Sequence, residues 1–392
     1  MSRVTRHLPL MSTTLHSEKM TIVFMNSIPA HIWRGGEKWM VNAAAGLHER
    51  GHTVICIGKN NAVWLDKAKL RGIAVKPMNI HADFSPIIIG MLVAFFLKVK
   101  PDVLCCNFEK DVRLGGIAAR IAGVRVVYVR KGLSLLCNKL RYRLAYKYFA
   151  DRVISPSQFI KDNFKQYTWL AQDRIDVVHN GVEIPDISKF DRNKILSICG
   201  NTARPVLFGD GSLFWHKGFE YLIEAVSFLN KKGYYPHAVI AGEGDAAPYR
   251  ELAIKFNVDN YIHFAGHRSD IPELMYGADI FVLSSIDEGL PNVVLEAMAV
   301  GTAVVASDAG GTKEIITDGQ NGYVVPVKSA VALAEKIELL LSDESLRSRI
   351  AKAGFECVKE KFTIEKNVEG VERLFKKSLT PPAPSPQSVE GE

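Results

Sequence analysis

The stretch "DIFVLSSIDEGLPNVVLEAMAVGTAVVASDAGGTKEII" (279–316) contains two short apolar runs separated by a helical pattern. Residues 280–283 and 303–306 are continuously apolar and do not alternate with polar residues, which is typical of strands in a parallel sheet covered on both faces. Between them, Pro291 fits the first position of a helix, where its missing N–H costs nothing. The stretch therefore predicts a strand–helix–strand unit of an α/β sheet.

The same alternation recurs along the whole chain, with about six short strands in each half. The segment Gly181–Pro205 is polar and broken by proline, so we place the linker there. The fold class predicted is α/β, with two doubly wound parallel-sheet domains facing each other across a cleft at their strand C-terminal ends. The predicted parts are an extension (1–19), a first domain (20–190), a second domain (200–360), a helix packing back on the first domain (361–378) and a disordered tail (379–392).

The composition is that of a globular protein with no spanning segment. The chain has 392 residues, 47% hydrophobic and 23% charged, and six cysteines without metal-ligand spacing. Reduced, buried thiols and a cytoplasmic location are expected. The apolar run Pro86–Leu97 has twelve residues, whereas a spanning helix takes about 20. It predicts either a buried helix or a shallow membrane-docking element.

Positive charge is concentrated in one segment. Residues 125–147 contain seven cations and no acid, although the net charge of the chain is only +7. The segment predicts either a solvated helix face or a patch for an anionic partner, such as phospholipid headgroups or a phosphorylated acceptor. Nucleic acid is not expected as a partner, because no recognised binding motif accompanies the charge.

Two glycine-containing turns before helices have the character of anion sites. Gly35-Gly36 opens a helix, and glycine there lets the backbone approach an anion at the helix N-terminus. Lys217-Gly218 precedes another amphipathic helix, where the lysine can neutralise a phosphate. A tight turn without a ligand and an ordinary surface lysine are the alternative interpretations.

Two glutamates stand near the helix of the opening stretch. Glu288 lies in the loop before it, and Glu296 lies in its second turn among apolar neighbours. The amides of Asn292 and Val293 occupy the positive end of that helix. A buried carboxylate must be hydrogen-bonded, so Glu296 is expected to meet either ribose hydroxyls or a buried cation. The loops 241–245, 265–275 and 309–312 end neighbouring strands and converge on the same cleft edge.

Read together, these segments resemble the retaining glycosyltransferases of family four, which have the GT-B fold. The stretch 287–316 resembles that family's E-x7-E signature with its following Gly-Gly turn, and the likeness runs from "RGGEKWMVNAAAGLHERGH" to "NGYVVP". The resemblance implies a nucleotide-sugar donor, UDP- or GDP-linked, and no further cofactor. The absence of Asp-x-Asp from the chain agrees with metal-independent transfer, so no metal site is predicted.

The resemblance also implies roles for particular residues. Lys217 would bind the diphosphate, Glu288 would lie near the transferred sugar, and Glu296 would bond the ribose. Asn107 stands where the family carries a sugar-contacting histidine, and it completes the predicted catalytic set with Glu288 and Lys217. The other residues implied to bind the donor are Gly35, Gly36, Ser212, Gly242, Arg268 (beside the base), Leu290, Pro291, Asn292 and Val293.

Two departures from the family leave alternatives open. Ser212 stands where the family has an arginine, so one phosphate-neutralising charge is missing unless Arg204 or Arg34 replaces it. Asn107 can hydrogen-bond a sugar hydroxyl but carries no charge. The function predicted is sugar transfer to a saccharide or lipid-linked acceptor in cell-envelope synthesis, at the inner face of the cytoplasmic membrane. A non-catalytic sugar-nucleotide or glycan-binding relative, a sugar-nucleotide epimerase and a phosphorylase are the alternatives.

Overall fold

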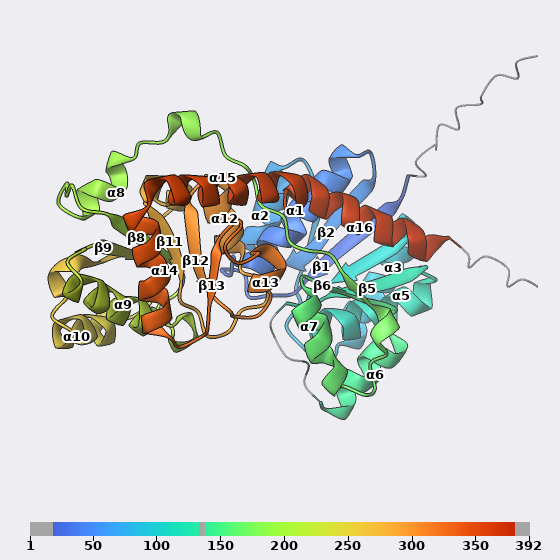
Figure 1. Ribbon diagram of the computed structural model, residues 1–392. Coiled ribbons are helices and arrows are strands. Elements are labelled where there is room, and N and C mark those ends of the chain that lie inside the picture. Colours follow the sequence, from blue (N-terminus) through green and yellow to red (C-terminus); the bar gives the residue numbers. More distant parts are fainter. Residues whose placement is uncertain (1–18, 133–135, 137, 381–392) are drawn as a thin grey trace, which may run out of the picture.

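The computed structural model describes residues 19–132, 136 and 138–380, which form two α/β domains lying side by side (Figure 1). The predictions for the N-terminal extension and the C-terminal tail fall almost entirely outside these residues. Every strand pairing in both sheets is parallel. The prediction of two doubly wound parallel sheets is confirmed.

The first sheet has the order β3-β2-β1-β4-β5-β6-β7. Its direction of winding reverses between β1 and β4, the place where doubly wound sheets bind ligands. The strands are β1 (Thr21–Asn26), β2 (Thr53–Lys59), β3 (Ala74–Met78), β4 (Val103–Cys106), β5 (Val126–Arg130), β6 (Arg152–Ser155) and β7 (Ile175–Val177).

The second sheet has the order β10-β9-β8-β11-β12-β13, with its reversal between β8 and β11. The opening stretch of the sequence supplies β11, the helix after it and β12. The strands are β8 (Val206–Asp210), β9 (His237–Ala241), β10 (Ile262–Gly266), β11 (Ile280–Leu283), β12 (Ala303–Ser307) and β13 (Tyr323–Val325).

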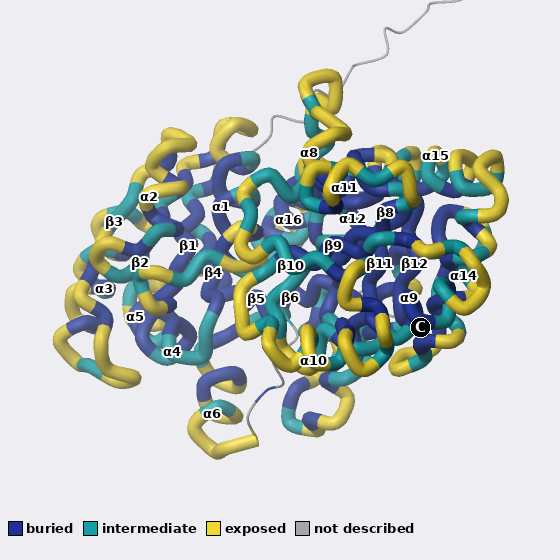
Figure 2. Tube along the Cα trace, turned by 90° about the vertical axis from the view of Figure 1, so that its left-hand side faces the viewer, coloured by how far each residue is buried: buried dark blue, intermediate teal, exposed yellow. Residues whose placement is uncertain are grey.

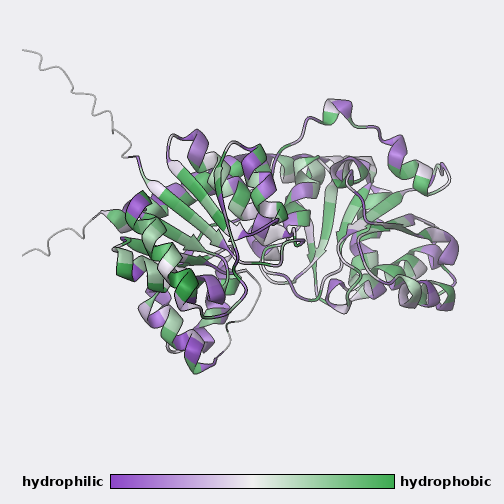
Figure 3. Cartoon of the chain, turned by 180° about the vertical axis from the view of Figure 1, so that it is seen from behind, coloured by the Kyte–Doolittle hydropathy of each residue, from purple (hydrophilic) through white to green (hydrophobic). Residues whose placement is uncertain are grey.

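Helices cover both faces of each sheet, so the central strands are buried along their whole length (Figure 2) and stand out as apolar arrows (Figure 3). This explains why their sequences do not alternate. The helices are α1 (Gly35–Glu49), α2 (Val63–Leu70), α3 (Pro86–Val99), α4 (Glu109–Asp111), α5 (Ile117–Ala122), α6 (Leu140–Tyr148), α7 (Gln158–Asn163), α8 (Asn193–Ile198), α9 (Phe219–Lys231), α10 (Ala247–Lys255), α11 (Ile271–Gly277), α12 (Asn292–Ala299), α13 (Thr312–Ile315), α14 (Ala330–Ser342), α15 (Glu344–Lys361) and α16 (Ile364–Leu379).

Two local features differ from the sequence-based expectations, and a third bears on the two alternatives given for the apolar run Pro86–Leu97. Strand β3 was not predicted, because an edge strand that contains Lys76 and Pro77 and has partly exposed side chains lacks an apolar run. Helix α12 begins at Asn292, and Pro291 is its N-cap rather than its first helical residue. Helix α3 buries one face only, since Leu92 and Phe96 are inside while Ile87 is exposed.

The chain crosses between the domains twice, and the two crossings are paired. The amide of Val182 bonds the carbonyl of Phe362, and the amide of Ile364 bonds the carbonyl of Val182. A side chain on Gly181 would lie 2.2 Å from the carbonyl oxygen of Thr363, so only glycine permits this approach. After the second crossing, α16 packs on α1 of the first domain and continues the line of α15 (Figure 1).

Candidate functional site

The centre of the site in the second domain is an ion pair. Lys217 Nζ lies 2.7 Å from Glu288 Oε1, and Ser285 Oγ donates to the same oxygen at 2.8 Å. The lysine ends the turn after β8, and the glutamate follows β11, the neighbouring strand. Both side chains are largely buried. Parallel strands thus bring residues 71 positions apart together at one sheet edge.

Glycines let the two loops approach so closely. Gly218 has a φ of +61°, and a Cβ there would lie 2.2 Å from the carbonyl oxygen of Ser284. Gly310 also has a φ of +61°, and its Cβ would lie 1.8 Å from the carbonyl oxygen of Glu288. The Gly-Gly turn after β12 therefore packs against the loop that carries Glu288. Gly218, next to Lys217, packs against the backbone at Ser284, the start of the same loop.

The N-terminus of α12 lies beside this pair. Asn292 and Val293 hold its first two positions, whose amides precede the helix's own hydrogen bonding. Leu290 and Pro291 are buried and anchor the entry to the helix. The helix dipole and Lys217 thus place positive potential at the same sheet edge.

Glu296, one turn into α12, lines a cavity of about 310 Å³ between the domains. No described residue donates a hydrogen bond or forms an ion pair with it, which differs from the expectation that a carboxylate in this setting is hydrogen-bonded. The cavity is lined by Trp33, Gly35, Lys38, Trp39, Asn42, Asn180, Gly181, Val182, Glu183, Pro185, Pro272, Asn292, Glu296, Val300, Ile364 and Asn367.

Two carboxyl groups of the second domain, of which Glu296 lines the cavity, have perturbed pKa values. Burial raises the pKa of Glu296 to about 7, against the opposing effect of Lys38 and with a contribution from Asp210. Burial also raises the pKa of Asp210 to about 6, against the opposing charges of Lys217 and Lys38. The charge of Lys38, from the first domain, therefore acts on both carboxyl groups of the second domain. Perturbed groups of this kind cluster at functional sites.

The first domain contributes a buried polar cluster at the N-terminus of α1. Glu37, 2% exposed, accepts hydrogen bonds from Asn26 and Asn107 and from the Arg34 amide. A Cβ on Gly36 would lie 3.5 Å from Asn107 Nδ2. Gly36 and Asn107 are thus neighbours, although 71 residues separate them.

Asparagines join this cluster to the second domain. Asn180, just before the linker, donates from Nδ2 to Asn292 Oδ1 at 2.9 Å. A Cβ on Gly35 would lie 3.7 Å from Asn292 Nδ2. The N-termini of α1 and α12 therefore meet at the domain boundary.

The remaining predicted donor-binding residues lie at the same edge but with different partners. A Cβ on Gly242 would collide with the carbonyl of Gly211, so this loop backs the turn that carries Ser212. Arg268 forms a two-point ion pair with Asp270, at 2.9 and 2.7 Å, in the loop after β10. Its contact with a base remains a prediction.

Sequence reasoning missed Lys38, Glu37, Asp210 and Asn180 as members of the site. Lys38 and Glu37 directly follow the Gly-Gly pair, and Asp210 precedes the Gly211–Leu213 turn. Their neighbours in the sequence were signals that could have found three of the four. Asn180 lies just before the linker, where no motif marks it.

The basic segment 125–147 is divided among three environments. Arg125 bonds the Leu379 carbonyl at the end of α16. Arg130 ends β5, Lys131 follows it, and both are buried. The other four cations, Lys139, Arg141, Arg143 and Lys147, are exposed on α6 or at its N-cap.

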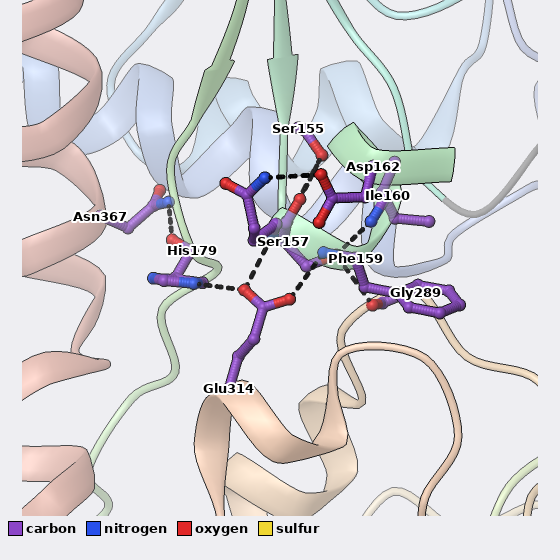
Figure 4. A network of polar contacts seen from close by, with 10 residues as sticks. Ser155, Ser157, Phe159, Ile160, Asp162, His179, Gly289, Glu314 and Asn367 are labelled. Atoms are coloured by element: carbon purple, nitrogen blue, oxygen red, sulfur yellow. Dashed lines mark hydrogen bonds and ion pairs between the residues drawn. The ribbon is translucent and has the colours of Figure 1, made fainter. Parts of the chain in front are cut away.

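Across the boundary, Glu314 of α13 connects the second domain to α7 of the first (Figure 4). Its carboxylate accepts from the amides of Gln158 and Phe159, each at 2.8 Å, and from His179 Nε2 at 2.8 Å. Burial would raise the pKa of Glu314, but these donors outweigh it and hold the pKa below its ordinary value. Ser157 Oγ also donates to the carbonyl of Gly289, next to Glu288.

We expect Glu314→Gln to lower the free energy of unfolding by about 1.5–3 kcal/mol, because charge-assisted hydrogen bonds are lost. Since the folded-state pKa is depressed, the stabilisation is present above pH 4.5, the ordinary value, and is lost as the pH falls. Chemical denaturation at pH 7 and pH 3.5 measures both effects. The exposed Glu251→Gln is the control, and an equal loss in both variants would contradict the role.

A second polar cluster lies away from the cleft. The ligand atoms of Cys199, His237 and His263 are all within 4.8 Å of one another. However, His237 Nδ1 and His263 Nε2 are 2.8 Å apart, a hydrogen-bond distance, whereas two ligands of one tetrahedral zinc ion stand about 3.3 Å apart. As placed, the two imidazoles bond each other.

Comparisons with known proteins cover most of the chain. Residues 33–184 match the family described as "Glycosyltransferase Family 4", and residues 200–356 match "Glycosyl transferases group 1". The chain is 28% identical to the lipopolysaccharide core biosynthesis glycosyltransferase LpsE of Rhizobium meliloti over 84% of this chain and 92% of that protein. It is 40% identical to N,N'-diacetylbacillosaminyl-diphospho-undecaprenol alpha-1,3-N-acetylgalactosaminyltransferase of Campylobacter jejuni, but only over 38% of this chain and 39% of that enzyme.

Solved structures show the same fold. A glycosyltransferase from Rickettsia africae aligns with a TM-score of 0.82 at 22% identity, covering 93% of this chain and 99% of that one. HepE of Anabaena, solved in complex with UDP, aligns with a TM-score of 0.79 at 21% identity, covering 91% of this chain and 100% of that one. The GT-B architecture predicted from the sequence is confirmed. Within the described residues, no helix is long and apolar enough to cross a membrane.

Proposed function

The chain resembles the family-four glycosyltransferases in both of its domains, and from this premise we propose that it transfers a sugar from a nucleotide-diphosphate-sugar donor with retention of configuration. The acceptor proposed is a saccharide or a lipid-linked saccharide of the cell envelope. The Rhizobium relative is named for lipopolysaccharide core synthesis, and the Campylobacter relative for an undecaprenol diphosphate acceptor. These names motivate the choice of acceptor class.

One observation supports this function most directly. The N-terminus of α12 meets the Gly35–Gly36 turn across the domain boundary, beside a cavity lined by Glu296. The loop that precedes α12 carries Glu288, which forms the ion pair with Lys217. A cation and two helix N-termini suit a diphosphate. A carboxylate without a protein donor suits the hydroxyls of a ribose.

In the proposed reaction, the glycosidic bond between the donor sugar and the diphosphate breaks, and a hydroxyl of the acceptor bonds the anomeric carbon on the same face. The proton of that hydroxyl passes to an oxygen of the leaving diphosphate. Lys217 and the α12 amides stabilise the negative charge that develops on the leaving diphosphate. Glu288 positions Lys217 and faces the sugar. No enzyme nucleophile and no metal ion take part, so activity is expected to persist in EDTA.

Incubation with labelled UDP- and GDP-sugars, with and without extracted envelope glycolipids, tests the proposal. The expected result is nucleotide release that depends on the acceptor, together with a labelled product of unchanged anomeric configuration by NMR. Thermal shift with UDP and GDP is the companion measurement. If neither nucleotide binds, the donor-site assignment is wrong.

We propose that α6 brings this acceptor within reach by docking on an anionic membrane. Exposed cations alternate there with exposed apolar side chains, Leu140, Leu144 and Tyr148. Arg141 also lies 3.8 Å from Asp83, next to the exposed Phe84. A helix with such a surface can lie in the headgroup region, and each cation near an anionic surface contributes about 1 kcal/mol.

Charge reversal at Arg141 and Arg143 should reduce binding to phosphatidylglycerol vesicles by at least about tenfold, since two favourable charges become unfavourable. Vesicle co-sedimentation at low and high salt measures this. Reversal at Lys352 and Lys359 of α15, exposed cations of the second domain, is the matched control. If both double variants bind the vesicles equally well, α6 is only a solvated helix face and the docking proposal is wrong.

A further inference from the structure

The donor site as described lacks one positive charge. Ser212 replaces the arginine that the resembled family places before its phosphate-binding lysine. Arg204 cannot supply the charge, because it lies ahead of β8, at the opposite edge of the sheet, with its guanidinium bonded to Tyr261. Arg34 is exposed at the N-cap of α1. Neither of the two replacements considered from the sequence therefore enters the site as a buried cation.

Arg130 is a buried cation at the edge of the first sheet where the strands have their C-terminal ends. It is the last residue of β5 and is 7% exposed. A Cβ on Gly36 would lie 3.5 Å from Arg130 Nη1 and from Asn107 Nδ2, so the backbone of Gly36 lies next to both groups. The guanidinium thus lies under the N-terminal turn of α1.

Arg130 has no carboxylate partner, in contrast to its neighbour. Lys131 forms an ion pair with Glu109. Glu37, the acid whose charge Arg130 feels, is bonded to amide donors instead. Within residues 19–132, 136 and 138–380, no carboxylate lies within 4.0 Å of the Arg130 guanidinium. A buried, uncompensated cation is costly unless an anion meets it.

Neighbouring side chains hold Arg130 toward the second domain. Its guanidinium lies over the Trp39 ring, 5.0 Å from the centroid. Arg130 Nη2 donates to Asn180 Oδ1 at 3.3 Å, and Asn180 in turn donates to Asn292 at the start of α12. Two hydrogen bonds therefore connect Arg130 with the helix terminus proposed to receive the diphosphate.

We propose that Arg130 binds the donor diphosphate from the first domain and supplies the positive charge that is missing at Ser212. This inference rests on the proposed function, because it takes the nucleotide donor as the ligand. Arg130 then makes the diphosphate a contact shared by both domains. Its burial keeps the charge under Gly35–Gly36 and out of bulk solvent, where it acts at lower dielectric than a surface cation.

Isothermal titration of Arg130→Gln with UDP and with uridine tests the proposal. A hydrogen bond to a charged group is worth about 1.5–3 kcal/mol, so the Kd for UDP should rise about 10- to 100-fold. The Kd for uridine, which has no phosphate, should not change. The midpoint of thermal unfolding of Arg130→Gln should equal or exceed that of the wild type, because a buried charge is removed. Arg204→Gln is the control and should leave both affinities unchanged.

The outcomes separate this inference from the proposed function. If the wild type binds neither UDP nor GDP, the proposed function fails first. If the wild type binds UDP and Arg130→Gln binds it equally well, the inference on Arg130 is overturned. A rise in the KM for the acceptor in that variant would then show that Arg130 binds an anionic group of the acceptor and not the donor diphosphate. Equal losses for UDP and uridine, with a lower thermal midpoint, would assign Arg130 a structural role and overturn the inference as well.

Discussion

Replacing Lys217 by methionine should lower kcat/KM about 10²- to 10³-fold, the usual loss when one charged group that stabilises a developing anion is removed. Lys217 is the cation of the second domain in direct contact with Glu288, at 2.7 Å. The loss should appear in kcat as well as KM, because the diphosphate gains charge only as the sugar leaves. Steady-state kinetics measures it, with the donor that the labelled UDP- and GDP-sugar assay selects.

A second variant separates two causes of that loss. Lys217→Met leaves the largely buried Glu288 without its cation, which is itself destabilising. Lys217→Met/Glu288→Gln removes both charges, so it restores stability. If activity also returns in the double variant, the lysine served only to hold Glu288, and its role on the diphosphate is refuted. Lys313→Met, which removes an exposed ion pair to Asp308, is the surface control.

Glu296→Gln should weaken UDP binding about 10- to 100-fold while leaving a folded protein. The carboxylate lines the cavity between the domains and has no protein donor among the described residues. Ribose hydroxyls would donate to it as a charged acceptor, and glutamine is a weaker acceptor. Comparing UDP with 2′-deoxy-UDP isolates this contact. If the variant keeps the wild type's preference for UDP, the ribose role is wrong.

The pH dependence of stability gives an independent test of Glu296. Its folded-state pKa of about 7 lies above the ordinary 4.5, so between these values the folded chain holds a proton that the unfolded chain has lost. The free energy of unfolding should therefore fall as the pH rises from 4.5 to 7, by at most about 3 kcal/mol. The glutamine variant lacks this fall and should be the more stable protein at pH 8, as measured by denaturation across that range. A wild type with no such fall would show that the carboxylate is not perturbed.

Nucleotide binding should then release a proton near neutral pH, because hydrogen bonds from a ligand favour the charged carboxylate. Calorimetry in two buffers of different ionisation enthalpy measures this release, which Glu296→Gln should abolish.

The sheets could be predicted because their central strands carry an unmistakable pattern. A strand buried on both faces, such as Val103–Cys106, must be apolar at every position. Edge strand β3 escaped prediction because one exposed side relaxes that requirement, and Pro77 is tolerated there. The start of α12 was misplaced by one residue because proline fits both the N-cap and the first helical position.

Residues of the site could be predicted where a motif lies on one loop. Lys217, Glu288 and the α12 terminus each follow a strand of the same sheet, and strand order alone brings them together. Contacts between domains gave no such signal. Asn180 and Arg130 matter through the way two separately folded surfaces meet, and neither the spacing nor the type of these residues specifies that meeting.

The packing of α16 on the first domain has a consequence for how the protein is made. Val368, Val371 and Phe375 belong to the same core as β1 and α1, and Val368 occupies the space left open by Gly46. A ribosome releases residues 19–180 long before residues 364–379. During synthesis the first domain therefore waits with an apolar groove along α1 while the second domain is translated and folds. Completion of the N-terminal core is the last step, so truncation of α16 should expose the first domain to aggregation and chaperone capture rather than damage the domain that precedes it in the chain.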